Sequence, residues 1–135
     1  MLQSLGTNML IPKSKRIKSK RHLEYVAKQR CCLTFSSDWC RGNVQAHHLL
    51  KPYEGKRGMG MKASDNNVVP LCYYHHSKLH DQQGDEDSFW VSQNKKRDFG
   101  RKTAEYWWNI SPYNEERFKK WMNNQLLLKS KYNKQ

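Results

Sequence analysis

Cysteine and histidine are concentrated in one short part of this chain. All four cysteines and five of the six histidines lie between Cys31 and His80, in a sequence of 135 residues. Mixed thiol and imidazole groups at short spacings are typical metal ligands, and a bound metal stabilises domains with a small apolar core. The hydrophobic fraction of 36% and the mean hydropathy of −1.05 indicate such a core. We therefore expect one metal-stabilised domain.

The segment from Cys72 to His80 predicts two separate metal-binding faces. In a helix, His76 and His80 lie one turn apart on one face, which suits two ligands of a single cation. Cys72 and His75 are three residues apart on another face and can bind a different ion. A row of surface histidines is the alternative, but it does not account for the number of histidines in so short a stretch.

Two adjacent histidines, His47 and His48, end a predicted strand. Neighbouring side chains in a strand point to opposite faces, so the two imidazoles suit different tasks. One of them can complete the site of His76 and His80. The other is then free to act as a general base, because imidazole titrates near neutral pH.

The pattern of the remaining residues predicts an α+β fold. Residues 32–35 and 44–49 are β-prone and are separated by turn residues, which predicts a hairpin. Glycine and proline mark residues 51–65 as a loop. Helices are expected after the N-cap Ser19 up to Arg30, over residues 72–82, 87–93 and 97–110, and from Pro112 onward with Ser111 as the cap.

Basic residues flank a nearly neutral centre. The chain carries 25 Lys and Arg against 12 Asp and Glu, a net charge of +13. Residues 1–30 contribute +7 and residues 91–135 contribute +7, whereas residues 31–90 contribute −1. A polyanion is the expected partner of such a chain.

The order of the histidines resembles a known family. His47 and His48, then Asn67, then His76 and His80 resemble the motif of the HNH (ββα-metal, His-Me finger) endonucleases. A wider set of matching residues comprises Gln45, Ala46, Gly58, Met59, Gly60, Met61, Lys62, Ala63, Ser64, Asp65, Pro70, Leu71, Cys72 and His75. This set resembles a phage and bacterial branch that includes the RecA-dependent nucleases.

The resemblance covers about residues 19–90 and implies a fold, an activity and a set of roles. The implied fold is a ββα-metal core with flanking helices, stabilised by zinc. The implied activity is metal-dependent hydrolysis of DNA with little sequence specificity. The implied ligands of the catalytic cation are His47, His76 and His80. The cation is magnesium, manganese or zinc. His48 matches the general base and Asn67 the residue that orients it, with Asp65 as a rival for that place.

Many HNH proteins also hold a structural zinc between two pairs of ligands. Cys72 and His75 match one pair. The other pair departs from the usual C-x-x-C spacing, and we expect it to consist of Cys40 with either Cys31 or Cys32. A metal-free fold with ordinary buried cysteines is the alternative.

The domain organisation and the partners follow from these expectations. We expect residues 1–18 to form a flexible basic arm and residues 19–135 to form the nuclease domain, with a core at 31–84 and a helical extension at 85–135. No stretch is apolar enough for a membrane span or a signal peptide, so no membrane partner and an intracellular location are expected.

DNA is the expected partner, with a recruiting protein such as a recombinase filament as a second one. Four basic residues between the predicted catalytic strand and helix are expected to contact phosphates: Lys51, Lys56, Arg57 and Lys62. The rival function is a zinc-stabilised nucleic-acid-binding module without catalysis.

Overall fold

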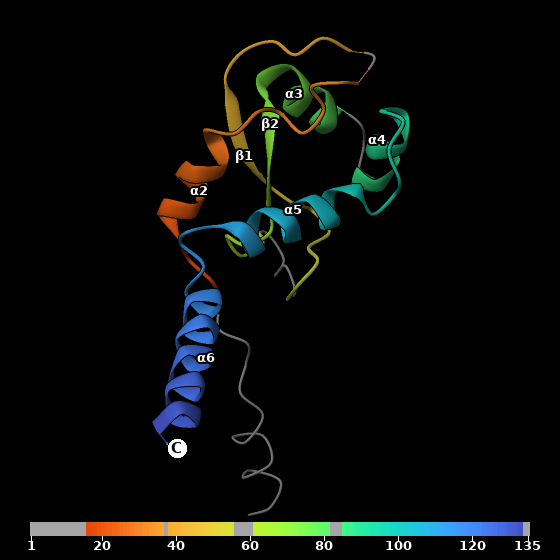
Figure 1. The fold of residues 1–135 in the computed structure, drawn as a ribbon. Coiled ribbons are helices and arrows are strands. Elements are labelled where there is room, and N and C mark those ends of the chain that lie inside the picture. Colours follow the sequence, from red (N-terminus) through yellow and green to blue (C-terminus); the bar gives the residue numbers. More distant parts are fainter. Residues whose placement is uncertain (1–15, 37, 56–60, 82–84, 134–135) are drawn as a thin grey trace, which may run out of the picture.

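The structure, a computed structural model, describes residues 16–36, 38–55, 61–81 and 85–133 (Figure 1). These residues form two strands and five helices, which is the α+β fold that the sequence predicts. Most of the predicted arm, together with Lys56 and Arg57 of the predicted DNA-contacting loop, lies outside the described residues.

The sheet consists of two antiparallel strands. β1 (Val44–His48) pairs with β2 (Val68–Cys72), and the register places Val44 opposite Cys72 and His48 opposite Val68. All five residues of β2 are buried, whereas β1 has only one buried side chain, that of His47. The sheet therefore places His47 on the inside of the fold at the end of β1.

The predicted pairing of residues 32–35 with residues 44–49 is wrong. Residues 32–35 instead form turns, in which Thr34 N donates to Cys31 O (3.1 Å) and Ser36 N donates to Leu33 O (3.0 Å). Cys31 and Leu33 are both buried in the core, which holds this segment as a turn rather than a strand. The partner of β1 comes from the far side of the long loop.

Helix α2 (Lys20–Ala27) lies beside the sheet (Figure 1). Ser19 is its N-cap, as predicted, and its Oγ accepts a hydrogen bond from His22 N (3.2 Å). Val26 and His22 are fully buried, and α2 contacts both strands. The helix ends at Ala27, three residues before the predicted end at Arg30.

Three further helices follow the sheet. β2 runs directly into α3 (Tyr73–Asp81), and then come α4 (Glu86–Ser92) and α5 (Phe99–Ile110). α4 begins after Asp85, whose carboxylate accepts from Ser88 N (3.4 Å). A Cβ on Gly100 would lie 2.7 Å from the indole nitrogen of Trp90, so this glycine lets α5 approach α4.

The core lies where the sheet meets α3, α4 and α5. Its buried residues are Cys31, Leu33, Leu49, Val69, Leu71, Cys72, Leu79, Phe89, Trp90 and Ala104. Two of these are cysteines of the predicted zinc site, so that site is continuous with the core.

Helix α6 (Glu115–Asn133) extends away from the rest of the fold (Figure 1). The prediction that it begins at Pro112 with Ser111 as the cap is wrong. Asn114 occupies the cap position, because its Oδ1 accepts from Arg117 N (3.1 Å). Ser111 Oγ is instead hydrogen-bonded to His22 Nδ1 of α2 (2.9 Å).

Candidate metal centres

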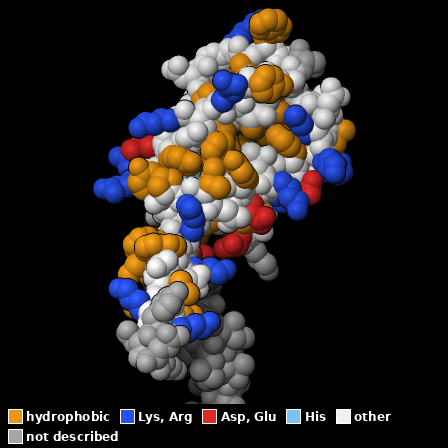
Figure 2. All heavy atoms as spheres, viewed as in Figure 1, with side chains coloured by type: hydrophobic (Ala, Val, Ile, Leu, Met, Phe, Trp, Pro, Cys, Tyr) orange, Lys and Arg blue, Asp and Glu red, His pale blue; other side chains and the backbone are white. Residues whose placement is uncertain are grey.

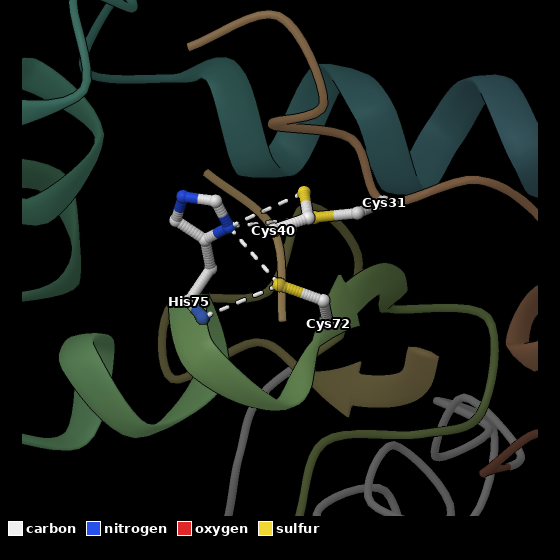
Figure 3. Close-up of side chains that lie close together, drawn as sticks. All are labelled: Cys31, Cys40, Cys72 and His75. Atoms are coloured by element: carbon white, nitrogen blue, oxygen red, sulfur yellow. Dashed lines mark hydrogen bonds between the residues drawn. The ribbon is translucent and has the colours of Figure 1, made fainter. Parts of the chain in front are cut away.

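A first cluster joins three cysteines to one histidine. His75 Nδ1 lies 3.1 Å from the sulfur of Cys72, 3.7 Å from that of Cys40 and 3.8 Å from that of Cys31. Figure 3 shows the three sulfurs and the imidazole facing a common point. In a tetrahedral zinc site with bonds of about 2.0–2.3 Å, ligand atoms lie roughly 3.3–3.8 Å apart. These four residues can therefore hold a structural zinc.

The protonation of the cluster depends on burial. Burial raises the pKa of the Cys31 thiol to about 12, so its thiolate is unfavourable unless a cation lies beside it. Burial lowers the pKa of His75, which keeps its imidazole in the neutral form that can bind a metal. Both directions follow from burial, and a bound cation would compensate the charge of the thiolate.

The cluster ties the segment after Cys31 to the start of α3. Cys72 ends β2, and His75 lies in the first turn of the helix that follows. The backbone reinforces this connection, because Tyr73 N donates to Asn43 O (2.9 Å) and Tyr74 N donates to Arg41 O (3.0 Å). A metal here would fix the start of α3 against Cys31 and Cys40.

Cys32, the alternative to Cys31 at this site, is not among the four clustered residues. Its thiol packs against the hydrophobic core, and its backbone N donates to Pro70 O (2.9 Å). Burial raises the pKa of the Cys32 thiol well above its usual range. The structure therefore brings Cys31 rather than Cys32 to the other three ligands.

A second cluster consists of His47 at the end of β1 with His76 and His80 on α3. His47 Nδ1 and His76 Nε2 are 3.1 Å apart, and His76 Nε2 and His80 Nε2 are 3.0 Å apart. Each residue offers one ring nitrogen, and the three nitrogens lie within 4.8 Å of one another. Burial, followed by the neighbouring His47 and His80, lowers the pKa of His76 to about 4.

The outward nitrogens of two of these rings have hydrogen-bond acceptors. His47 Nε2 donates to Glu86 Oε2 (2.9 Å), and His76 Nδ1 donates to Gln45 Oε1 (2.8 Å). The Glu86 oxygen also accepts from Leu50 N (3.0 Å), and the Glu86 side chain is 1% exposed. Such bonds place the hydrogen on the outer nitrogen and leave a lone pair on the inner one.

His48 has a carboxylate partner of its own. Its Nε2 donates to Asp65 Oδ1 (2.9 Å), while Asp65 Oδ2 accepts from Ser19 N (2.8 Å) at the start of α2. The carboxylate is thus held from both sides. The hydrogen on Nε2 leaves a lone pair on the Nδ1 atom of His48.

One cavity of about 250 Å³ contains both groups of histidines. Its lining residues are Ala46, His47, His48, Leu49, Leu50, Lys62, Ala63, His76 and His80. The three clustered imidazoles and the separate imidazole of His48 therefore face the same space, with the exposed Lys62 at its wall.

The family model described as "Protein of unknown function (DUF968)" matches residues 4–94 of the chain. The chain belongs to the DUF968 family. A curated relative, the uncharacterized protein YdfU of Escherichia coli strain K12, is 37% identical over 73 residues. That match covers 53% of this chain and 19% of the relative, so the chain spans only about a fifth of the relative's length. No solved structure matches.

The matched part of this DUF968 chain includes both clusters and Glu86. Among the described residues, no helix combines the length and the apolar character that a membrane crossing requires.

Asn67 occupies a different place from the one that the HNH resemblance implied. Its Oδ1 accepts from Tyr53 N (2.8 Å), and its amide group donates to Glu54 O (3.0 Å) and Ser64 Oγ (3.1 Å). In this member of the DUF968 family Asn67 therefore fastens the two ends of the long loop. The hydrogen-bond partner of His48 is Asp65, the rival that the sequence left open.

The predicted phosphate-binding lysines also differ in their surroundings. Lys51 Nζ lies 3.5 Å from Asp85 Oδ1 and 3.4 Å from Asp87 Oδ2, so two carboxylates already neutralise it. Lys62 is exposed at the cavity wall.

Sequence reasoning assigned no role to Glu86 or Gln45. Gln45 is two residues before His47 in β1, so the two side chains lie on the same face of the strand. Glu86 is 39 residues beyond His47, and its acidic neighbours suggest only a helix start. The position of Gln45 in the strand could therefore have indicated its contact with the cluster, whereas nothing in the sequence indicates that of Glu86.

Proposed function

We propose that this chain is a metal-dependent endonuclease of the HNH type that hydrolyses DNA with little sequence specificity. The observation that carries the proposal is the cavity in which His47, His76 and His80 turn ring nitrogens toward one another beside His48. The succession of β1, β2 and α3 agrees with the strand, strand and helix order that the resemblance implies.

The donor set fits a divalent cation. The hydrogen bonds to Glu86 and Gln45 leave the inner nitrogens of His47 and His76 as two lone pairs 3.1 Å apart. Lone pairs at this distance repel each other unless a positive charge lies between them. We infer that the pair, completed by His80, binds magnesium, manganese or zinc. A cation bound here supplies charge stabilisation to the phosphate group and its leaving oxygen.

His48 is the proposed general base. Asp65 accepts the Nε2 hydrogen, so that Nδ1 of His48 is free to take a proton from the attacking water. Asp65 holds the ring in this orientation, because Ser19 N fixes the other oxygen of the carboxylate. The pair resembles the carboxylate and imidazole pair of hydrolases, in which the acid orients the base and stabilises its charged form.

The cysteine cluster is proposed as a structural zinc site. Three thiols and a neutral imidazole are a common tetrahedral zinc set. Zinc would connect the turn that contains Cys31 to the start of α3, and α3 carries His76 and His80. The structural metal would thereby keep two ligands of the catalytic cation in place.

DNA is the proposed substrate because of charge. The chain has a net charge of +13, and Lys62 stands at the wall of the cavity. Contacts with phosphates give salt-sensitive binding that does not distinguish between sequences. A protein partner such as a recombinase filament is proposed as a source of targeting.

Metal counting and cleavage of supercoiled plasmid together test the proposal. We expect one tightly held zinc per chain, a second and exchangeable cation, and nicked or linear DNA with magnesium or manganese. If the chain is a non-catalytic zinc module, it should bind one metal only and leave the plasmid intact with every divalent cation tested. A recruited nuclease cuts only when a recombinase filament is added, so the assay includes that arm. Intact plasmid in every arm contradicts the proposal.

A further inference from the structure

The turn segment between Cys31 and Cys40 exposes two large aromatic side chains. Phe35 is 87% exposed and Trp39 is 85% exposed, the two highest values among large hydrophobic side chains in the described part of the chain. Burying aromatic rings of this size would stabilise the fold, so leaving two of them in water within five residues gives up that stabilisation twice.

The segment that carries these rings is well anchored. Its two ends, Cys31 and Cys40, meet in the thiol and imidazole cluster, and Leu33 is fully buried. Asp38, between the two aromatic residues, pairs with Lys78 of α3 and accepts from Gln93 Nε2 (3.4 Å). The described residues on either side of the rings are therefore held against the rest of the fold.

Positive charge surrounds the same loop. Arg30 and Arg41 flank the two cysteines, and both are exposed. The guanidinium of Arg30 lies 6.0 Å from the ring centroid of Phe35, and that of Arg41 lies 5.5 Å from the ring of Tyr74. Lys78 neutralises the loop's own acid, Asp38. Figure 2 shows hydrophobic and basic side chains next to one another at the end of the molecule that this segment crosses in Figure 1.

Two exposed rings flanked by two arginines match the chemistry of an unpaired nucleic-acid strand. Bases stack on aromatic rings, and arginines contact the phosphates between them. A lipid surface or an apolar protein groove favours one continuous apolar face, whereas the polar residues Ser36 and Asp38 stand between the two aromatic residues in the sequence and an arginine flanks each side.

We propose that Phe35 and Trp39 stack on the bases of unpaired nucleotides, while Arg30 and Arg41 contact their phosphates. This inference rests on the DNA-binding part of the proposed function and extends it to a substrate class. The preferred DNA has a single-stranded region, such as a gap, flap or displaced strand, beside the duplex.

Binding of the full zinc-loaded chain to labelled oligonucleotides tests the inference. The probes are a twelve-residue thymidine strand, a strand of equal length without bases, and a duplex. Phe35→Ala and Trp39→Ala should each weaken binding of the thymidine strand by about fivefold to a hundredfold and leave binding of the base-free strand unchanged. Phe118→Ala and Trp121→Ala, matched exposed aromatic residues on α6, should leave both affinities unchanged.

Equal losses for the thymidine and base-free strands, no loss in either loop variant, or the same loss in the α6 controls would overturn the inference. Loss confined to binding of the recombinase filament would assign the loop to a protein instead and also overturn it. Zinc content and melting temperature should stay at wild-type values, because both rings lie in water. Magnesium and manganese are left out of the assay. The outcome is therefore independent of whether the chain cleaves DNA.

Discussion

Glu86 offers the sharpest test of the histidine cluster, because its carboxylate lies behind His47 and outside the cavity lining. Glu86→Gln keeps the size of the side chain and one oxygen that can accept from both His47 Nε2 and Leu50 N. It removes the negative charge that makes His47 a stronger ligand. Loss of such an outer partner typically weakens metal binding about tenfold to a hundredfold. We expect that loss with a stability change below about 1.5 kcal/mol.

Glu86→Ala separates the structural contribution from the electrostatic one. It leaves the buried His47 donor and the half-buried Leu50 N without their acceptor, each at up to about 1–3 kcal/mol, so the expected destabilisation is roughly 2–6 kcal/mol. A stability loss of this size is a large part of a small domain's total stability.

The assay is calorimetric titration of manganese into protein whose cysteine cluster is already filled with zinc, with thermal unfolding measured in parallel. Asp87→Asn is the matched control. It removes an acid one residue away that pairs with Arg101 (2.9 Å), outside the histidine cluster. Wild-type manganese affinity in Glu86→Gln, or an equal loss in Asp87→Asn, would refute the role given to Glu86.

Three further predictions concern zinc, pH and charge. Cys72→Ser should lose zinc and melt at a lower temperature, whereas Cys32→Ser should keep its zinc by metal analysis; equal zinc loss contradicts the ligand set. Burial lowers the pKa of His22 to about 4, so this residue alone should account for about 3 kcal/mol of the stability lost as pH drops from 6.5 to 4, since mainly the unfolded chain takes up that proton. Denaturant titrations should show a smaller loss of unfolding free energy between these pH values for His22→Gln than for the wild type. An equal loss in the two proteins would contradict the role given to His22. Lys62→Glu should weaken duplex binding and reduce its salt dependence more than Lys129→Glu on α6, as anisotropy in rising salt can show.

The convergence of the histidines could be predicted from the sequence because it depends on local periodicity. His76 and His80 are four residues apart, so any helix places them on one face. The predicted helix included Cys72, but Cys72 is the last residue of β2. It meets His75 because β2 runs directly into the first turn of α3, so its place does not follow from helical spacing.

The sheet could not be predicted in this way. Residues 32–35 have β-prone side chains, but core burial of Cys31 and Leu33 fixes them in turns. Pro70 lacks a backbone N–H and so argues against a strand, yet it lies in β2 opposite Ala46. The pairing of β1 with β2 is a long-range contact that local propensity does not report.

The contacts of the two carboxylates with the histidines could not be predicted for a similar reason. Asp65 accepts from His48 with one oxygen while Ser19 N, at the start of α2, holds the other. Glu86 reaches His47 because α4 packs against the core through the buried Phe89. Both contacts depend on tertiary packing between distant segments.

The central claim is that His48 removes a proton while His76 and His80 hold the cation, and nicking rates measured across a cation titration test it most directly. His48→Ala should cut about a hundredfold to ten-thousandfold more slowly at every cation concentration, with wild-type cation affinity. His80→Ala should lose both cation affinity and rate, with partial recovery at high cation concentration. A wild-type rate in His48→Ala, or full recovery of that variant by excess cation, would contradict the claim.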